Sequence, residues 1–296
     1  MTDPAAGGKP PPIQPPPIQR PPTARARSDE GDETPAPPTR AESEGIERAQ
    51  ARLVELSGAA RAEAPDLGAT LLGWPGRGPA FNHATCLRWS VNDWRDRAAH
   101  VAERLVVGGE APCVVVSTGL TTPADLAARL EQAGWVAIGH EVVMWTRRAA
   151  AVPHLEGELR LVAVTEPLVE EYEAVERRIF GISEREAGDR RSALAASLAR
   201  DPLRVYLVRD AGIPVATARL LVEDGLAAIH GLGVVPEQRR RGLGAYLTTI
   251  VTRAGLALGA SLVWLSVDHE NTPARALYAG LDYRSDFEWR RFLSVD

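Results

Sequence analysis

The sequence has little of what would cross-link it covalently or hold it in a membrane. Its two cysteines, Cys86 and Cys113, lie in apolar surroundings without C-x-x-C or Cys/His spacing, so neither a disulfide framework nor a cysteine-bound metal is indicated. We expect both to be buried structural thiols. No stretch approaches ~18 uninterrupted apolar residues, and the N-terminus lacks an apolar signal core. These absences predict a soluble cytoplasmic protein with no membrane partner.

Lysine is also nearly absent, since Lys9 is the only one and arginine supplies the other basic side chains. The 296 residues carry a formal net charge of -5, which argues against nucleic acid as the main partner and slightly favours a cationic substrate. We attribute the near-exclusive use of arginine to the coding bias of a GC-rich genome, so runs of arginine carry less functional weight than usual. With 45% hydrophobic residues, most of the chain can bury a core.

Residues 1–42 differ in composition from the rest. Of the 23 prolines, 12 lie within the first 40 residues. Proline removes backbone donors, and this segment offers few apolar side chains to bury. We expect a disordered Pro-rich tail, with binding to an aromatic groove of a partner as the alternative.

Hydrophobic periodicity divides the remainder into two halves. In the first, residues 43–150, it predicts a helix through 42–64 with Ile46, Ala49, Leu53 and Leu56 on one face, a helix capped by Ser90, a strand at 112–118, a helix at 121–134 and strand structure at 135–148. In the second, residues 154–296, it predicts strand 159–165, helices at 166–180 and 191–200, three strands over 203–235, a helix after the loop at 236–244, strand 261–268, helix 272–280 and a final strand at 283–293. This order indicates an α/β fold with a mixed sheet.

The stretch "VVPEQRRRGLGAYLTTIV", Val234 to Val251, places arginines and glycines between an expected strand and an expected helix. A helix N-terminus exposes unpaired N–H groups and attracts phosphate, and glycine lets an anion approach the backbone. A solvated turn in an arginine-rich protein is the alternative. The P-loop pattern fails because G-K-[ST] is missing, and the dinucleotide fingerprint fails because G-x-G-x-x-G is missing.

The surrounding residues favour the phosphate site. The run 239–244 fits R-x-x-G-x-G after a strand ending "LGVVP", and Asn271 to Tyr278 form an Asn-x-x-Ala-x-x-Leu-Tyr box about two dozen residues later. Together, over residues 159–293, these motifs resemble the GNAT superfamily of N-acetyltransferases. One departure is Asp282-Tyr283, where the family usually has Gly-Phe.

The resemblance implies acetyl-CoA as co-substrate, with no metal, and a role for each matching position. The implied cofactor-binding residues are Leu232, Gly233, Val234, Arg239, Arg240, Arg241, Gly242, Leu243, Gly244, Ala245 and Asn271. Among them, the backbone of Leu232 and Val234 would pair with the pantetheine arm, and the amides of Arg240 through Ala245 would hold the pyrophosphate.

Two side chains are candidates for the chemistry. Tyr278 would protonate the departing thiolate, as the resemblance implies, unless it is only a core aromatic. His230 lies two residues before Leu232 and has an ordinary pKa suited to proton removal, although a structural histidine is an equal alternative. Glu223 and Asp224 are alternative bases on the preceding hairpin. Trp264 and Trp289 are expected in the core.

The first half shows a weak internal repeat of the second, called the echo below, since the same Thr-Pro-Ala sequence occurs at Thr122-Pro123-Ala124 and, 150 residues later, at Thr272-Pro273-Ala274. Where the echo would need a phosphate loop, residues 87–99 contain no glycine. We therefore expect a degenerate GNAT-like domain at 43–150 and a catalytic GNAT domain at 154–296. The predicted function is acetyl transfer to a small-molecule or peptide amine, and a non-catalytic acyl-CoA-binding module is the rival. A homodimer is left open.

Overall fold

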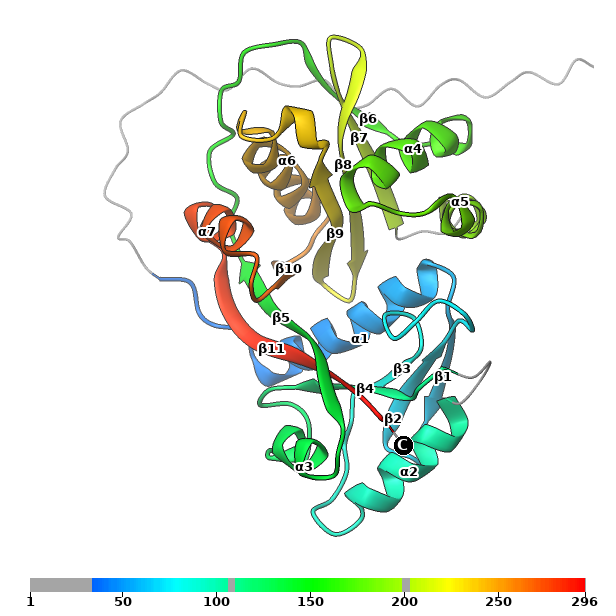
Figure 1. Ribbon diagram of the computed structural model, residues 1–296. Helices are drawn as coiled ribbons and strands as arrows, with labels where there is room; N and C mark the ends of the chain where they lie inside the picture. Colours follow the sequence, from blue (N-terminus) through cyan, green and yellow to red (C-terminus); the bar gives the residue numbers. More distant parts are fainter. Residues whose placement is uncertain (1–33, 106–109, 199–202, 296) are drawn as a thin grey trace, which may run out of the picture. The chain divides into compact units, whose positions relative to one another are not determined.

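The computed structural model describes residues 34–105, 110–198 and 203–295. Most of the expected Pro-rich tail lies outside these residues. Pro35–Asp296 form one compact unit. The first half contains α1 (Arg40–Leu56), β1 (Ala60–Ala64), β2 (Ala69–Gly73), β3 (His83–Thr85), α2 (Trp94–Leu105), β4 (Cys113–Ser117), α3 (Leu126–Gln132) and β5 (Val136–Thr146) (Figure 1).

The second half follows the predicted order of elements throughout. It contains β6 (Leu159–Ala163), the 3-10 turn Glu166–Leu168, α4 (Val169–Phe180), α5 (Glu184–Leu198), β7 (Leu203–Asp210), β8 (Ile213–Glu223), β9 (Leu226–Val234), the 3-10 turn Pro236–Gln238, α6 (Leu243–Ala257), β10 (Leu262–Asp268), α7 (Thr272–Gly280) and β11 (Arg284–Leu293). The prediction of one strand, two helices, three strands and then alternating helices and strands is confirmed.

All eleven strands of the described residues join one mixed sheet in the order β1-β2-β3-β4-β11-β5-β10-β9-β8-β7-β6. The pairs β3–β4 and β9–β10 are parallel and the others are antiparallel. The last strand, β11, lies between β4 and β5, and β5 lies between β11 and β10. Each half therefore contributes a strand to the centre of the sheet beside the other half.

The pairing pattern repeats about that centre. Outward from the central pair β11–β5, each side begins with an antiparallel pair, a parallel pair and two antiparallel pairs. The second half then adds one more antiparallel pair, β7–β6. The helix α2 joins β3 to β4 as α6 joins β9 to β10, and α3 precedes β5 as α7 precedes β11. This arrangement is what a duplicated unit would produce, and it agrees with the echo read from the sequence.

Three strands of the first half were not predicted. The expected helix through 42–64 ends at Leu56, and 60–64 form β1. The cause is the turn at Gly58, whose φ is +118° and where a Cβ would lie 2.5 Å from the Trp74 ring. Alanines in 60–64 favour a helix intrinsically, but pairing with β2 outweighs that preference. The helix α1 also begins at Arg40, so its first three residues lie inside the stretch assigned to the tail.

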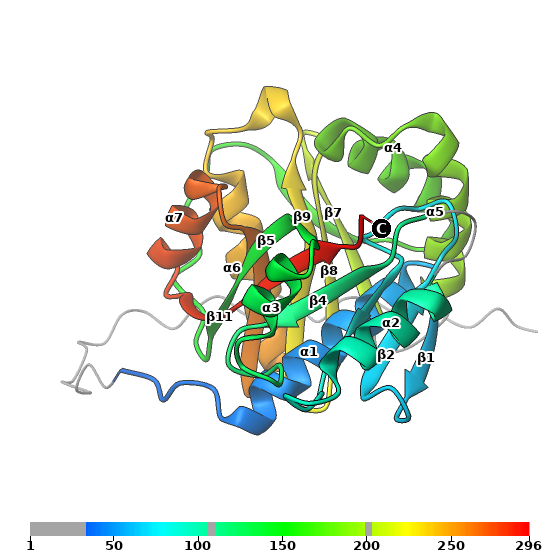
Figure 2. The ribbon, with the colours of Figure 1, turned by 60° about the horizontal axis from the view of Figure 1, so that its bottom comes forward.

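Helices cover both faces of the second half of the sheet. Figures 1 and 2 show α6 on one side of β8 and β9 and α4 on the other. A Cβ on Gly255 of α6 would meet Ala227, whereas a Cβ on Gly45 of α1 would meet Leu226. Because adjacent residues of a strand point to opposite faces of the sheet, α1 packs on the face opposite α6. As predicted, Trp264 and Trp289 are buried, with ring centroids 5.8 Å apart.

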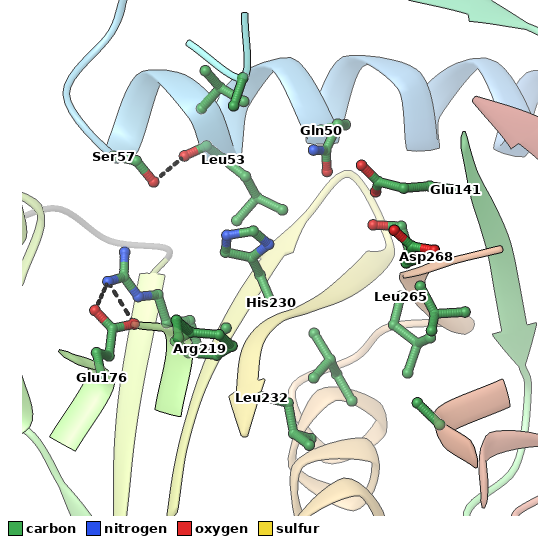
Figure 3. Close-up of a pocket in the computed structure, with 18 of the residues that line it drawn as sticks. Gln50, Leu53, Ser57, Glu141, Glu176, Arg219, His230, Leu232, Leu265 and Asp268 are labelled. Carbon is green, nitrogen blue, oxygen red and sulfur yellow. Dashed lines mark hydrogen bonds and ion pairs between the residues drawn. The ribbon is translucent and has the colours of Figure 1, made fainter. Parts of the chain in front are cut away.

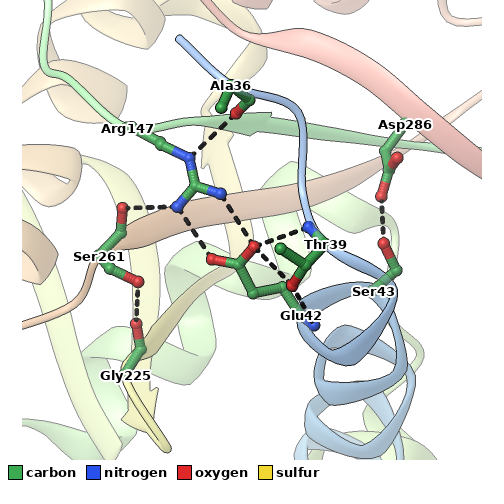
Figure 4. A network of polar contacts seen from close by, with 8 residues as sticks. All are labelled: Ala36, Thr39, Glu42, Ser43, Arg147, Gly225, Ser261 and Asp286. Atoms are coloured by element: carbon green, nitrogen blue, oxygen red, sulfur yellow. Dashed lines mark hydrogen bonds and ion pairs between the residues drawn. The ribbon is translucent and has the colours of Figure 1, made fainter.

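The start of α1 is fixed to the sheet by a polar network (Figure 4). Thr39 and Glu42 form a capping box, and Arg147, just after β5, donates to both carboxylate oxygens of Glu42 at 2.9 Å. Hydrogen bonds from Arg147 hold the pKa of Glu42 down at about 2. Ser43 donates to Asp286 of β11 at 2.9 Å. These contacts place α1 where it can form a wall of the cavity described below.

Candidate active site

The site begins where β9 and β10 separate. The two strands pair only over Leu226–Ala228 and Leu262–Trp264, although they continue to Val234 and Asp268. A register shift between β8 and β9 marks a bulge at Gly231, whose φ is +59°. Beyond Ala228, the edge of β9 that faces β10 therefore borders a gap.

The loop after β9 presents a run of free amides. Among the described residues, the backbone N–H groups of Arg240 through Ala245 have no acceptor. Gly242 is the N-cap of α6 with φ +82°, and it has no side chain to cap the helix. A Cβ there would lie 2.8 Å from Leu155 Cδ2, and a Cβ on Gly244 would lie 3.2 Å from Leu277. Unbonded N–H groups at a helix N-terminus form an anion site, so this loop fits a pyrophosphate.

The three arginines of the loop differ in what they contact. Arg239 donates through Nε to the Val234 carbonyl at 3.1 Å, so it braces the strand end. Arg241 pairs with Asp210 at 3.0 Å. Arg240 has φ +64° and is exposed, and its guanidinium has no hydrogen bond or ion pair with any residue described. Of the three, Arg240 is the side chain free to bind a phosphate.

A cavity of about 480 Å³ opens from the gap between the strands (Figure 3). The second half contributes strand residues of β9 and β10 and the helix residues Asn271, Ala274 and Tyr278. The first half contributes α1, the loop at 80–81 and Glu141, and β11 contributes Arg291. The expected sites converge here, because His230, Leu232, Asn271 and Tyr278 all line the cavity. Glu223 and Asp224 do not line the cavity, so the structure gives no support for either of them as the general base.

His230 is neutral at physiological pH. Burial and, to a smaller extent, the positive charge of Arg219 together lower its pKa to about 4. Figure 3 shows the ring between two groups of side chains. Arg219 and Glu176 lie on one side of it, and Glu141, Asp268 and Gln50 lie on the other. It can accept a proton, but less readily than an exposed histidine.

Tyr278 is 8% exposed, and burial raises the pKa of its hydroxyl to about 12. It therefore stays protonated at neutral pH. Asn271 caps α7, accepting from the Ala274 N–H at 3.2 Å through its side-chain oxygen. That bond leaves the amide NH₂ of Asn271 as the group available to a ligand.

Sequence reasoning missed the charged pairs of the cavity wall. Arg219 donates through Nη2 to both carboxylate oxygens of Glu176, at 2.9 and 2.7 Å, and Tyr172 donates to Glu176 at 2.8 Å. Glu141 accepts from Arg291 at 2.5 Å. Burial alone would raise the pKa of Glu141, but Arg291 outweighs it and holds that pKa below its usual value. The partners are 43 and 150 residues apart, so no local pattern reveals them.

The departure at Asp282-Tyr283 does not disturb the turn. Asp282 has φ +66°, the left-handed conformation that glycine adopts readily, and Arg148 pairs with it at 3.1 Å. Tyr283 is buried, with its hydroxyl 2.7 Å from Thr252 Oγ1.

Outside the cavity, His140, His269 and Glu288 bring donor atoms within 4.8 Å of one another. The two imidazoles stack at 4.1 Å with an 8° interplanar angle, so their in-plane lone pairs run parallel and do not converge on one ion. Cys113 is buried and Cys86 partly buried, and burial raises their pKa values to about 12 and about 11, which keeps both thiols protonated. Within the described ranges, no helix combines the length and apolarity needed to cross a membrane.

Comparisons with known proteins agree with this geometry. Residues 167–283 match the model of the acetyltransferase (GNAT) family. Mycothiol acetyltransferases of Clavibacter michiganensis subsp. michiganensis and Clavibacter sepedonicus are 38% and 39% identical over 95 and 99 residues. Each of these matches covers 31% of this chain and 31% of the relative, so the chain spans about a third of the curated relatives it matches.

The fold is shared over more of the chain. A GCN5-related N-acetyltransferase from Kribbella flavida has a TM-score of 0.64 at 17% identity, covering 83% of this chain and 96% of that one. A tandem GNAT protein from the clavulanic acid biosynthesis pathway has a TM-score of 0.58 at 16% identity, covering 76% and 78%. These likenesses confirm the predicted fold class, and the family match supports acetyl transfer as the general chemistry. The chain contains, at residues 167–283, an acetyltransferase domain of the GNAT family.

Proposed function

We propose that the protein is an acetyl-CoA-dependent N-acetyltransferase that moves the acetyl group to a primary amine by direct attack in a ternary complex. The observation that carries this proposal is the run of unbonded amides from Arg240 to Ala245, which follows the strand whose separated edge borders the cavity. A pyrophosphate at the helix N-terminus and an extended arm along β9 would direct the thioester into that cavity.

When bound, acetyl-CoA supplies an activated carbonyl carbon and a thiolate leaving group. The chain must then accept a proton from the amine and stabilise the thiolate. His230 lines the cavity and is neutral at pH 7, so it is the candidate acceptor, directly or through water. The NH₂ of Asn271 and the free β9 edge would position the cofactor arm.

Tyr278 is better suited to donate a hydrogen bond than to give up its proton completely. Its pKa of about 12 lies above that of an ordinary thiol, which is near ~8.5, so full transfer to the thiolate would be uphill. A hydrogen bond to a charged acceptor contributes about 1.5–3 kcal/mol without that penalty. We therefore infer that Tyr278 stabilises the developing thiolate through its hydroxyl.

The rival function is an acyl-CoA-binding module that does no chemistry. It requires the phosphate loop but neither Tyr278 nor His230. The presence of both side chains in one cavity with the β9 edge favours the enzyme.

The decisive test is a calorimetric titration of acetyl-CoA into the wild type and a Gly242→Glu variant. The new carboxylate would stand at the helix N-terminus, and two like charges ~5 Å apart at an effective dielectric constant of ~20 repel by about 3 kcal/mol. We expect micromolar binding by the wild type and at least a ~100-fold loss in the variant.

Gly259→Glu is the matched control. Gly259 also has a left-handed φ, +96°, but it follows the other end of α6 and a Cβ there meets nothing within 4 Å. Both variants share the conformational cost of about 1–2 kcal/mol, whereas only Gly242→Glu opposes the phosphate and also requires Leu155 to move. Equal losses in the two variants, or no binding by the folded wild type, would refute the phosphate site.

A further inference from the structure

One cation in the cavity wall has no hydrogen-bond or ion-pair partner among the described residues. Arg190, on α5, lines the cavity, and its guanidinium makes no hydrogen bond or ion pair with any residue that the structure describes. Its one ring contact is Phe81, 5.9 Å from the guanidinium carbon. The acidic neighbour Glu186 accepts instead from the backbone N–H and hydroxyl of Ser183 at the start of α5.

The other two arginines that line the cavity each have an ion-pair partner. Arg219 is held by Glu176, and Arg291 by Glu141. Arg190 is half-buried, and burial lowers its pKa even though the negative charges of Glu176 and Glu186 act in the opposite direction. Withdrawing a guanidinium from water without a partner is unfavourable, and a carboxylate is the group that satisfies it best.

Oxygen atoms gather on the other side of His230. Figure 3 shows Glu141, Asp268 and Gln50 together there, while Arg219 and Glu176 lie on the opposite side. The side-chain oxygen of Gln50 is buried and has no donor among the described residues. Arg190 lies on α5, which packs against α4, the helix that carries Glu176. The cavity thus offers a positive group on one side of His230 and ammonium-binding oxygens on the other.

We propose that the acceptor amine also carries a carboxylate, as an amino acid or short peptide does, and that Arg190 binds this carboxylate. The proposal rests on the proposed N-acetyltransferase function and names the substrate class of the same site. The oxygens near Gln50 would attract the ammonium group, and the apolar side chains of Leu53 and Phe81 line the space that the rest of the acceptor would occupy. Arg190 is a specificity residue in this scheme and takes no part in bond making.

The test compares acceptors that differ only in the carboxylate, by measuring release of the CoA thiol. Suitable pairs are phenylalanine with phenethylamine, lysine with cadaverine, and a dipeptide with its amide. The wild type should prefer the carboxylate member by at least ~10-fold in kcat/KM, mainly through KM, since charge-assisted hydrogen bonds are strong. Arg190→Gln should reduce this ratio toward one, and Arg190→Lys should keep part of it. Arg191→Gln, on the neighbouring exposed arginine that pairs with Glu173, should leave the ratio unchanged.

A wild-type preference for the amine without the carboxylate would overturn the proposal, as would equal ratios in the wild type and Arg190→Gln. A binding measurement separates this failure from failure of the proposed function. N-acetylphenylalanine and its amide are titrated into the wild type and Arg190→Gln in the presence of CoA. Tighter binding of the carboxylate that disappears in Arg190→Gln would support the site even if no acceptor were acetylated. Equal binding of acid and amide would refute it even if acetyl transfer were observed.

Discussion

Replacing His230 by glutamine should alter how stability depends on pH, because the folded protein keeps this ring neutral. Its pKa is lowered to about 4 by burial and by Arg219, whereas in the unfolded chain a histidine titrates near ~6.5. The unfolded state therefore binds the proton first as the pH falls. The stabilising contribution is complete above ~6.5 and is lost between about pH 6.5 and pH 4.

The size of the effect follows from the two pKa values. Their separation corresponds to at most about 3 kcal/mol of unfolding free energy, and to less because the ring is partly exposed to water in the cavity. The free energy of unfolding is measured with urea at pH values from 7.5 to 4. Over this range the wild type should lose up to about 3 kcal/mol more unfolding free energy than His230→Gln. Ring signals in NMR spectra, assigned by their absence from the variant, should give the pKa of His230 directly.

His83 provides a matched control. Burial lowers its pKa to about 3, but it lies on β3 and does not line the cavity. His83→Gln should weaken the same acid-induced loss of stability without slowing acetyl transfer, whereas His230→Gln should slow it. Parallel stability curves for the wild type and His230→Gln, together with a ring titrating near ~6.5, would show that the ring is not desolvated and would refute the reasoning.

Two further substitutions test the cavity. Tyr278→Phe should lower kcat by about 10- to 100-fold with acetyl-CoA binding intact, the loss expected for one charge-assisted hydrogen bond. Unchanged turnover would exclude the hydroxyl from the reaction, and absence of any turnover in the wild type would favour the binding-module alternative. Arg219→Met leaves Glu176 buried at 4% exposure without its partner and should cost about 3–5 kcal/mol of unfolding free energy in urea. A loss below ~1 kcal/mol would mean that Glu176 is reached by water or neutralised.

The conformation of the loop that we propose to bind phosphate was predictable because every feature of it is local. Gly242 permits the left-handed conformation, α6 starts at the next residue, and the strand before it ends at Val234. These determinants lie within about a dozen residues, so the sequence shows them side by side. The positions of Tyr278 and Asn271 could also be predicted from the sequence, since the motif that contains them begins a helix shortly after a buried strand. His230 was a candidate because it lies two residues before Leu232 on the same strand, and it does line the cavity. Its low pKa depends on burial that no sequence pattern shows.

The sequence could not show that both halves build the site, because that depends on where β5 and β11 lie in the sheet. Their exchange brings Glu141 and Arg291, 150 residues apart, into contact in the cavity wall. The first half has no glycine loop before α2, and the Ser90 hydroxyl there accepts from the N–H groups of Asn92 and Asp93. The half that we expect to bind no cofactor nevertheless supplies α1 and Glu141 to the cavity. We therefore propose that this half shapes the acceptor side of the site, whose proposed phosphate loop lies entirely in the other half.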